Sequence, residues 1–294
     1  MEFIMEKALI IDGNYLMFQS FYATYRGDIN VILRTSNGTP TNAITLFLKQ
    51  LVKYLVFYKP DYLFIAFDAK ERTKRHELLD GYKANRIKAP QELFIQFDLI
   101  KEILKEMKVF YYESAGDEAD DLIATFCRNF ESLEKFIFSR DKDLLQLVNK
   151  NTRVFFKDEE VTYLNFFEKY QINPDQIIDF KALKGDPSDN LPGIKGIGDK
   201  TAIKLLNEFK TFENIYQNLD SKLISEKVKN NLLKGKENGM LCYQLAKLNY
   251  EVEVLPKNLD LFKLNIDLKA SEKILDELEL NTTKKMLLDK RWLQ

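Results

Sequence analysis

Residues 8–13 of the chain read ALIIDG, an apolar run that leads directly into Asp12. The pattern returns twice: YLFIAF, at 62–67, is followed by Asp68, and KFIFS, at 135–139, is followed by a further group of aspartates. All three runs are continuously apolar instead of alternating, which is typical of strands buried on both faces of a sheet. We therefore predict three central strands that each end beside an acidic side chain.

Helical patterns lie between the predicted strands, at 41–57, 93–107 and 117–130. Strands that alternate with helices favour an α/β fold, in which helices flank a central, mostly parallel sheet. In such sheets ligands bind beyond the carboxyl ends of the strands. The aspartates that follow the three strands are therefore expected at one rim of the sheet; they are Asp12, Asp68, Asp141 and Asp143.

Acidic residues also crowd the segment GDEADD, at 116–121, which opens the third helical pattern. Four carboxylates fall within five residues, and two unit charges about 4 Å apart repel by roughly 4 kcal/mol at an effective dielectric constant near 20. The helix macrodipole favours one or two acids in a first turn, and Asp117 suits an N-cap. Four acids exceed what that local effect explains, which favours a functional reason for the cluster.

The composition is that of an ordinary soluble globular protein, with 294 residues, 45% hydrophobic and 30% charged. A chain of this length can form one large domain or two. Two separated cysteines, Cys127 and Cys242, fit a reducing cytoplasm and exclude a thiolate metal cage. His76 is the only histidine, which excludes histidine-rich metal sites. The N-terminus lacks the basic flank of a signal peptide and no apolar run reaches about 18 residues, so we expect a cytoplasmic protein without a membrane span.

The second half of the sequence contains the stretch KALKGDPSDNLPGIKGIGDKTAIKLLNEF, at 181–209, which adds Asp186 and Asp189 to the acidic residues. Its later part is a glycine-rich turn leading into a helix, where exposed N–H groups can bind a phosphate and glycine lets it approach closely. A P-loop is excluded because Asp199 stands where that motif needs lysine, and a dinucleotide fingerprint is excluded because Thr201 stands where it needs a third glycine. We predict a hairpin that binds a nucleic-acid backbone; a plain helical packing element is the alternative.

A basic segment, at 70–90, follows directly after Asp68 and contains seven basic residues against three acidic ones. Lys83 and Arg86 are three positions apart and could share a helical face. Such a segment is often only a solvated surface helix, but its position beside the predicted acidic rim favours a functional interpretation.

Six motifs, in order along the chain, resemble those of the 5′→3′ exonuclease (flap endonuclease) family, and most closely the nuclease domain of bacterial DNA polymerases I. They are IIDGNYLMFQSF, FDAKERTKRHE, GYKANR, DEADDLIAT, RDKDLLQL and KGDPSDNLPGIKGIGDKTAIKLL. The resemblance covers roughly residues 5–250 and implies a PIN-like or Rossmann-like α/β fold in a free-standing nuclease. It also implies three parts: a catalytic domain at 1–175 with a helical arch at about 70–95, a helix–three-turn–helix subdomain at 176–250, and a helical tail at 251–294.

The resemblance implies that nine carboxylates bind two divalent ions, Mg²⁺ or Mn²⁺. It places Asp12, Asp68, Glu118, Asp120 and Asp121 towards one ion, Asp143, Asp186 and Asp189 towards the other, and Asp141 between them. Hard divalent cations relieve the repulsion among such carboxylates, and two of them about 4 Å apart activate a water and stabilise the attacking and leaving oxygens of a phosphodiester. Setting these nine aside leaves 36 acidic residues against 44 basic ones, which suits a polyanionic substrate.

The same resemblance implies the contacts with DNA. Lys83 and Arg86 would contact the scissile phosphate diester, and both count as catalytic together with Asp68 and Asp141. Tyr82 would stack on a base, while Arg75 and His76 match the base of the arch. The hairpin would hold the duplex and can bind a K⁺ through backbone carbonyls; its residues are Gly193, Lys195, Gly196, Gly198, Lys200, Thr201 and Lys204.

The implied function is that of a structure-specific 5′→3′ DNA exonuclease and flap endonuclease in primer removal and DNA repair. The expected partners are 5′ flaps, nicked or gapped duplexes and RNA–DNA primers, with a separate DNA polymerase, and the protein is expected to be a monomer. Two alternatives stay open: a non-cleaving protein that binds flapped DNA, and a PIN-like ribonuclease. The sequence departs from the family motifs at Phe18, Gln19 and Lys74. These departures concern the expected contact with a downstream phosphate of the DNA and not the metal site.

Overall fold

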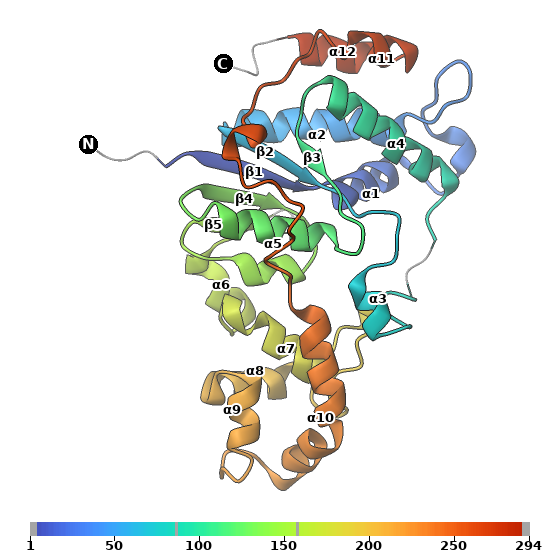
Figure 1. The fold of residues 1–294 in the computed structure, drawn as a ribbon. Helices are drawn as coiled ribbons and strands as arrows, with labels where there is room; N and C mark the ends of the chain where they lie inside the picture. Colours follow the sequence, from blue (N-terminus) through green and yellow to red (C-terminus); the bar gives the residue numbers. More distant parts are fainter. Residues whose placement is uncertain (1–4, 86–87, 157–158, 290–294) are drawn as a thin grey trace.

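The computed structural model describes residues 5–85, 88–156 and 159–289. A six-stranded sheet, in the order β3-β2-β1-β4-β5-β6, forms the centre of the upper part of Figure 1. Neighbouring strands are parallel except for β5 and β6, so the predicted mostly parallel sheet is confirmed. The strands are β1 (Lys7–Asp12), β2 (Tyr62–Ala66), β3 (Tyr111–Tyr112), β4 (Glu134–Phe138), β5 (Thr152–Phe156) and β6 (Glu159–Val161).

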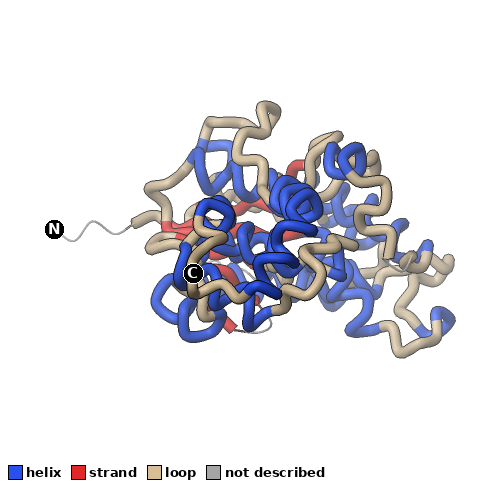
Figure 2. The backbone as a smooth tube through the Cα atoms, turned by 90° about the horizontal axis from the view of Figure 1, so that it is seen from below, coloured by secondary structure: helices blue, strands red, loops and turns tan. Residues whose placement is uncertain are grey.

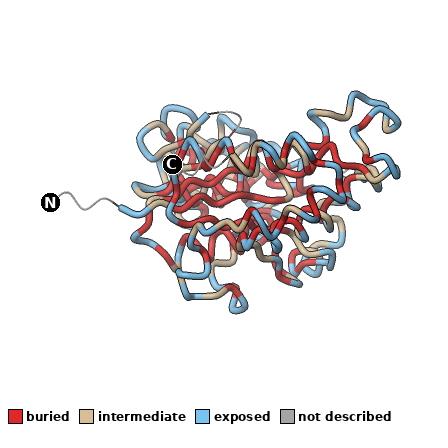
Figure 3. Tube along the Cα trace, turned by 90° about the horizontal axis from the view of Figure 1, so that it is seen from above, coloured by how far each residue is buried: buried red, intermediate tan, exposed pale blue. Residues whose placement is uncertain are grey.

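Both faces of the sheet are covered, which explains the continuous apolar runs. Ala8 and Ile10 of β1 belong to one hydrophobic cluster and Leu9 and Ile11 to the other, because successive side chains point to opposite faces. Figure 3 shows the buried residues concentrated between the layers. The first cluster is covered by α5 (Ala119–Asn129), and the second by α1 (Gly13–Thr24), α2 (Asn42–Tyr58) and α4 (Gln91–Glu106).

A second, helical lobe lies below the sheet in Figure 1, and Figure 2 views the molecule from this end. Its longest helix, α10, packs closely because two of its glycines leave room: a Cβ on Gly235 would lie 2.7 Å from Ile194, and one on Gly239 would lie 2.8 Å from Phe212. The helices of this lobe are α6 (Tyr163–Tyr170), α7 (Ile177–Lys184), α8 (Asp199–Phe209), α9 (Phe212–Gln217) and α10 (Glu226–Ala246). Short 3₁₀ turns occur at Ile29–Val31, Asp143–Leu147, Pro174–Gln176 and Pro187–Asp189.

The segment after α10 returns to the sheet and contributes to both hydrophobic clusters. Phe262, in the 3₁₀ turn Leu259–Phe262, places its ring 4.9 Å from that of Phe126 and 5.3 Å from that of Phe64. The short helices α11 (Glu272–Glu277) and α12 (Asn281–Leu288) then add buried leucines on the α2 side, at the top of Figure 1. No helix in the described ranges combines the length and apolar character that crossing a membrane requires.

The described part of the arch is less helical than predicted. In its described part before α4, the arch contains one helix, α3 (Lys74–Leu78), and continues as turns. Lys83 has a left-handed backbone, with φ at 56°, so it lies in a turn and not on the helical face predicted to pair it with Arg86. Arg86 itself lies outside the described residues.

Candidate functional site

Asp12 links the ends of two strands. It is the last residue of β1 and also the N-cap of α1, where its Oδ1 accepts a hydrogen bond of 2.8 Å from the Tyr15 N–H. Its Oδ2 accepts a bond of 2.7 Å from the hydroxyl of Ser139, which follows β4 directly. The carboxylate is therefore fixed where β1 and β4 end side by side.

Asp68 is held at the same rim by two other segments. Its Oδ1 accepts a bond of 2.8 Å from the Ala119 N–H, at the start of α5, and its Oδ2 accepts one of 2.9 Å from the amide of Asn14. Asn14 also accepts the Asp68 N–H at 3.0 Å, so the two side chains hold each other in place. Asn14 and Ser139 were not predicted; the only signal in the sequence is that each lies within two residues of an acid of the rim.

The acids of the rim affect one another electrostatically. Burial, aided by the charges of Asp68 and Asp141, raises the pKa of Asp12 to about 7. Burial and the charges of Asp141 and Asp12 also raise the pKa of Asp120 well above its ordinary value. Such shifts mean that a second negative charge is unfavourable without a compensating cation.

Lys181 provides such a cation for one pair of acids. This lysine of α7 is 5% exposed, and its ammonium forms ion pairs with Asp143 and, at 2.9 Å, with Asp186. Burial opposes ionisation, yet Lys181 and Ser188 lower the pKa of Asp186 to about 2. At Asp143 burial dominates and raises the pKa to about 7 despite Lys181. Sequence reasoning missed Lys181, although it lies only five positions before Asp186.

Arg75 neutralises a second pair of acids, Glu118 and Asp121. Its guanidinium donates two bonds of 2.7 Å to the two oxygens of Asp121 and one of 3.1 Å to Glu118. The remaining donors bind the carbonyls of Leu245 and Lys247. Arg75 is 8% exposed and its donors are used inside the protein, while its contact with DNA stays a prediction.

Asp121 is accordingly a partner of Arg75. Besides the guanidinium, its Oδ1 accepts the Asn249 N–H at 2.8 Å and its Oδ2 accepts the Glu118 N–H at 3.0 Å. Both oxygens of Asp121 therefore accept hydrogen bonds from donors of the chain. Asp121 therefore anchors the arch through Arg75, and its role as a metal ligand stays a prediction.

Tyr82 is also buried in this structure, and its stacking on a DNA base stays a prediction. It is 3% exposed, its hydroxyl donates to Glu118 at 3.2 Å, and its ring meets that of His76 edge-on at 5.3 Å. The Lys83 ammonium lies 2.9 Å from the same Glu118 carboxylate and 5.0 Å from the centre of the Tyr82 ring. Glu118 thus connects α5 to the arch.

Local contacts hold the arch next to the C-terminal lobe. His76 Nδ1 lies 2.9 Å from the Thr73 hydroxyl, across the first turn of α3, so its contact is a local helix cap. Farther along, the Lys83 N–H donates to the carbonyl of Asp189 at 3.1 Å. Asp189 is 3% exposed and lies in the turn that follows Asp186.

The predicted hairpin has the features of an anion site. Gly193 has φ at 59°, and a Cβ there would lie 2.3 Å from the backbone of Gly185, so only glycine fits. α8 begins after Gly198 without a side-chain cap, which leaves N–H groups at its start for a phosphate. The lysines of the hairpin are exposed, as are two glycines, and Thr201 is half-buried; these residues are Lys195, Gly196, Gly198, Lys200 and Lys204.

The donor set at the rim suits a hard divalent cation, since it consists of carboxylate oxygens that repel one another. Within the ranges that the structure describes, no three Asp, Glu, His or Cys side chains form a ready-made cage around one ion. Arg75 pairs with Asp121, and Lys181 pairs with Asp143 and Asp186. Asp12 and Asp120, whose pKa values are raised, retain the character of cation ligands.

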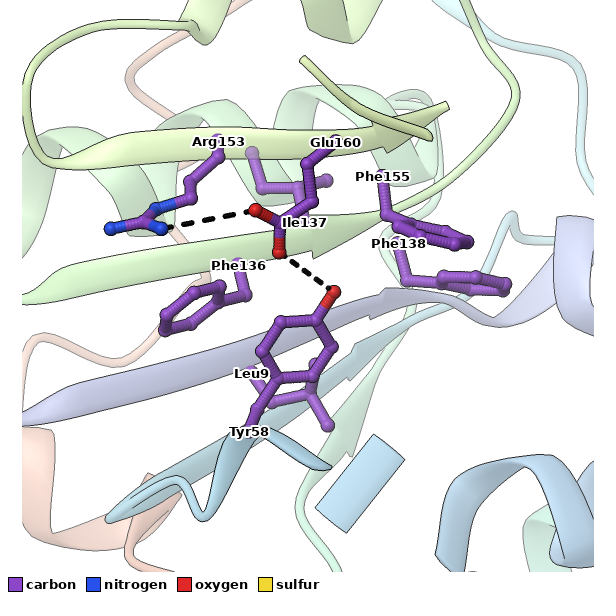
Figure 4. A pocket seen from close by; sticks show the side chains of 8 residues that line it. All are labelled: Leu9, Tyr58, Phe136, Ile137, Phe138, Arg153, Phe155 and Glu160. Atoms are coloured by element: carbon purple, nitrogen blue, oxygen red, sulfur yellow. Dashed lines mark hydrogen bonds and ion pairs between the residues drawn. The ribbon is translucent and has the colours of Figure 1, made fainter. Parts of the chain in front are cut away.

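A crevice on the sheet is separate from these carboxylates, none of which lines it (Figure 4). Glu160 accepts the Tyr58 hydroxyl at 3.2 Å and lies 3.8 Å from Arg153, whose guanidinium covers the ring of Phe136. Burial and the Glu160 charge raise the pKa of Tyr58. These side chains pair with one another, so their contacts hold α2 against β5 and β6.

Comparisons with known proteins show which family the chain resembles. Two family models match, "5′-3′ exonuclease, N-terminal resolvase-like domain" over residues 7–171 and "5′-3′ exonuclease, C-terminal SAM fold" over 172–270. A 5′-3′ exonuclease of Mycoplasmopsis pulmonis (strain UAB CTIP) is 40% identical over 275 residues, which is 92% of this chain and 90% of the relative. DNA polymerase I of Caldicellulosiruptor bescii is 38% identical over 96% of this chain, which spans only 33% of that polymerase.

Among solved structures, phage T5 5′-exonuclease with bound zinc ions superposes with a TM-score of 0.69 at 21% identity, covering 92% of this chain and 99% of the phage protein. At that identity the likeness shows the fold alone. The two family models cover most of the chain, and the relative from Mycoplasmopsis pulmonis matches nearly end to end. The chain therefore belongs to the 5′–3′ exonuclease family.

Proposed function

We propose that the chain is a structure-specific 5′→3′ DNA exonuclease and 5′ flap endonuclease that depends on two divalent ions. One observation carries the proposal: carboxylates from the ends of β1 and β2 and from the segment after β4 meet at one rim. Hydrogen bonds from Ser139 to Asp12 and from Ala119 to Asp68 hold these segments together. Parallel sheets bind ligands at this edge.

The residues that would hold the ions are Asp12, Asp68, Glu118, Asp120, Asp121, Asp141, Asp143, Asp186 and Asp189. We propose Mg²⁺ as the resident ion, with Mn²⁺ able to replace it. When bound, divalent ions neutralise the negative charge that develops on a phosphodiester and lower the pKa of water, so that hydroxide becomes available as the nucleophile. Their oxygen preference matches this donor set.

The side chains of the rim supply orientation. Asp12 is fixed by Tyr15 and Ser139, and Asp68 by Asn14 and Ala119, so neither carboxylate has to reorganise when a substrate arrives. Lys83 keeps its ammonium at the rim through Glu118, where it adds positive charge beside the phosphate under attack. We propose the same role for Arg86 of the arch.

The helical lobe would hold the duplex. The exposed lysines and glycines of the hairpin and the open start of α8 suit contacts with phosphates, which position DNA without reading its sequence. A K⁺ bound by the hairpin carbonyls would add to this grip. We assign catalysis to residues 1–175, duplex binding to 176–250 and support of the sheet to 251–294. A cytoplasmic monomer that acts on flaps, nicks and RNA–DNA primers beside a separate polymerase completes the proposal.

The test is cleavage of one DNA flap labelled at its 5′ end, with Mg²⁺ and with EDTA. Wild type, Asp141→Ala and the control Asp276→Asn are compared; Asp276 is an exposed acid paired with Lys284 in the tail. Release of a whole flap by wild type and the control only with Mg²⁺, and its loss in Asp141→Ala, is the expected result. Equal cleavage by Asp141→Ala, or cleavage in EDTA, would end the proposal.

A further inference from the structure

A cavity of about 730 Å³ opens in the helical lobe, between α7, α9 and α10. None of the carboxylates of the rim and none of the hairpin residues lines it. Three aromatic rings form part of its wall: the ring of Phe212 lies 4.9 Å from that of Tyr216 and 6.2 Å from that of Tyr243. The nuclease function leaves this cavity without a role.

The polar lining of the cavity is mostly negative. Asp175, Asp179 and Glu213 line it, and none of the three forms an ion pair with a residue in the described part of the chain. Among the described residues that line the cavity, Lys236 is the one cation, and its ammonium lies over the Tyr216 ring, 5.3 Å from the centre. The acids that line the cavity therefore outnumber the cation, and the excess negative charge lies beside aromatic rings.

Asp179 differs from the other two acids because it is buried, with 6% exposed. One of its oxygens accepts the Phe212 N–H at 2.7 Å, which anchors the first turn of α9. That contact explains the presence of an acceptor, but an amide or a hydroxyl would serve as well without a buried charge. A buried carboxylate without a cation is unfavourable, and burial raises the pKa of Asp179 to about 6.

The combination of carboxylates and aromatic rings selects the chemistry of a ligand. Ring faces attract ammonium and guanidinium groups, and carboxylates bind the same groups with charge-assisted hydrogen bonds. A bare metal ion fits less well, because only one carboxylate is buried and the rest of the wall is aromatic. The volume is large enough for an alkyl chain with a cationic head.

We propose that this cavity binds an organic cation, an alkyl ammonium or guanidinium group, with Asp179 as its buried counter-ion. Asp175 and Glu213 attract the cation at the exposed mouth, and Tyr216 and Tyr243 form the sides. Two sources share this chemistry: a free polyamine, and a lysine or arginine side chain of a partner protein. The site is independent of the nuclease reaction, since it shares no residue with the rim.

Calorimetric titration of the full chain with n-butylguanidinium tests the proposal, with n-butylurea as a neutral probe of the same shape. Saturating Ca²⁺ is present throughout, so that the acids at the rim do not take up the probe. We expect saturable binding of one n-butylguanidinium, at least tenfold weaker in Asp179→Asn, and no saturable binding of n-butylurea. Asparagine keeps an oxygen for the Phe212 N–H, and a melting temperature no lower than that of wild type checks the fold.

Glu237→Gln is the matched control, because Glu237 is an exposed acid of α10 outside the cavity, and its affinity should stay within twofold of wild type. Absence of binding to wild type, equal affinity in Asp179→Asn, or equal binding of n-butylurea would each overturn the proposal. If Asp179→Asn is misfolded, Asp175→Asn combined with Glu213→Gln takes its place, with at least fivefold weaker binding expected and unchanged affinity contradicting the site.

Two further probes distinguish the sources of the cation. Spermidine represents a free polyamine, and the blocked tripeptide acetyl-Gly-Arg-Gly-amide represents the side chain of a partner. Tighter binding of spermidine, lost in Asp179→Asn, supports a polyamine site. Tighter binding of the tripeptide, with the same loss, supports a docking site for a basic segment.

Discussion

Two groups of acids share one rim but differ in what balances their charge. Asp12 and Asp120 form no ion pair with any residue in the ranges that the structure describes, and burial raises the pKa of both. Asp121 and Asp186 each contact a buried cation of the chain, Arg75 and Lys181 respectively. The first group needs a charge from outside the chain, and the second already has one inside it.

The difference explains how so many acids coexist in one fold. Neutralising all of them internally would leave no ligand for a divalent ion, and neutralising none would place several like charges in a buried site. Arg75 and Lys181 take up part of the charge and connect the arch and α7 to the sheet. Metal binding and structural support are thus divided between neighbouring side chains.

Asp12→Asn should have the largest effect. Asparagine keeps the acceptor for the Tyr15 N–H but removes one negative charge from the acids that have no ion pair within the chain. Cleavage of a flap should therefore fall about a thousandfold, which is the loss typical when a group that stabilises transition-state charge is removed. The melting temperature in EDTA should not fall, because one repulsion is removed. Rates and melting curves of the same preparation check both statements. Near-normal cleavage would contradict the assignment of Asp12 to the unpaired group.

Arg75→Ala should act on stability. It leaves Asp121 and Glu118 buried without their partner, so the free energy of unfolding should fall by about 3–5 kcal/mol. Urea denaturation measures the change. Arg128→Ala is the control, since Arg128 and Glu251 form an exposed pair expected to contribute less than about 1 kcal/mol. Similar losses in both variants would show that Asp121 does not depend on Arg75.

Lys181→Met should turn acids with an internal cation into acids without one. Without the ammonium, Asp143 and Asp186 join the unpaired acids, so unfolding in EDTA should become easier by about 3 kcal/mol. Excess Ca²⁺ should recover part of that loss, because a divalent ion can take the place of the lost charge. The control Lys184→Met removes a more exposed lysine that pairs with Asp199. An equal loss with and without Ca²⁺ would count against the proposed ion site.

Asp179→Asn should change stability least among these variants. Because Asp179 lies away from the rim, the variant shows what burial alone does to a carboxyl group, without repulsion from the acids of the rim. Burial is the main cause of its raised pKa, and the charge of Asp175 adds to it. The folded state binds the proton more tightly than the unfolded state, so wild type loses stability as the pH rises from about 4 to about 6, and no more above that.

The asparagine variant has no such titration. Its advantage over wild type should be near zero at pH 4 and roughly 1 kcal/mol at pH 7.5, since part of the carboxylate charge is still screened by solvent. Melting temperatures across this pH range measure the difference. A constant difference between the two proteins would mean that Asp179 does not titrate with a raised pKa.

Much of the architecture follows from local patterns in the sequence. The continuous apolar runs at 8–11 and 62–67 predicted buried parallel strands, and the acids that follow them lie at the expected rim. Gly193 was recognised as a turn glycine, and its positive φ agrees. These features depend on neighbouring residues, so the order of side chains along the chain is enough to predict them.

The partners of the charged residues depend instead on which distant segments the fold brings together. Arg75 pairs with Asp121, 46 positions away, and with the carbonyl of Leu245, 170 positions away. Tyr82 reads as a free aromatic in a basic segment, but α5 and the C-terminal lobe bury it. Whether a basic or aromatic side chain is available to DNA is set by packing between remote segments, and the linear pattern carries no record of that packing.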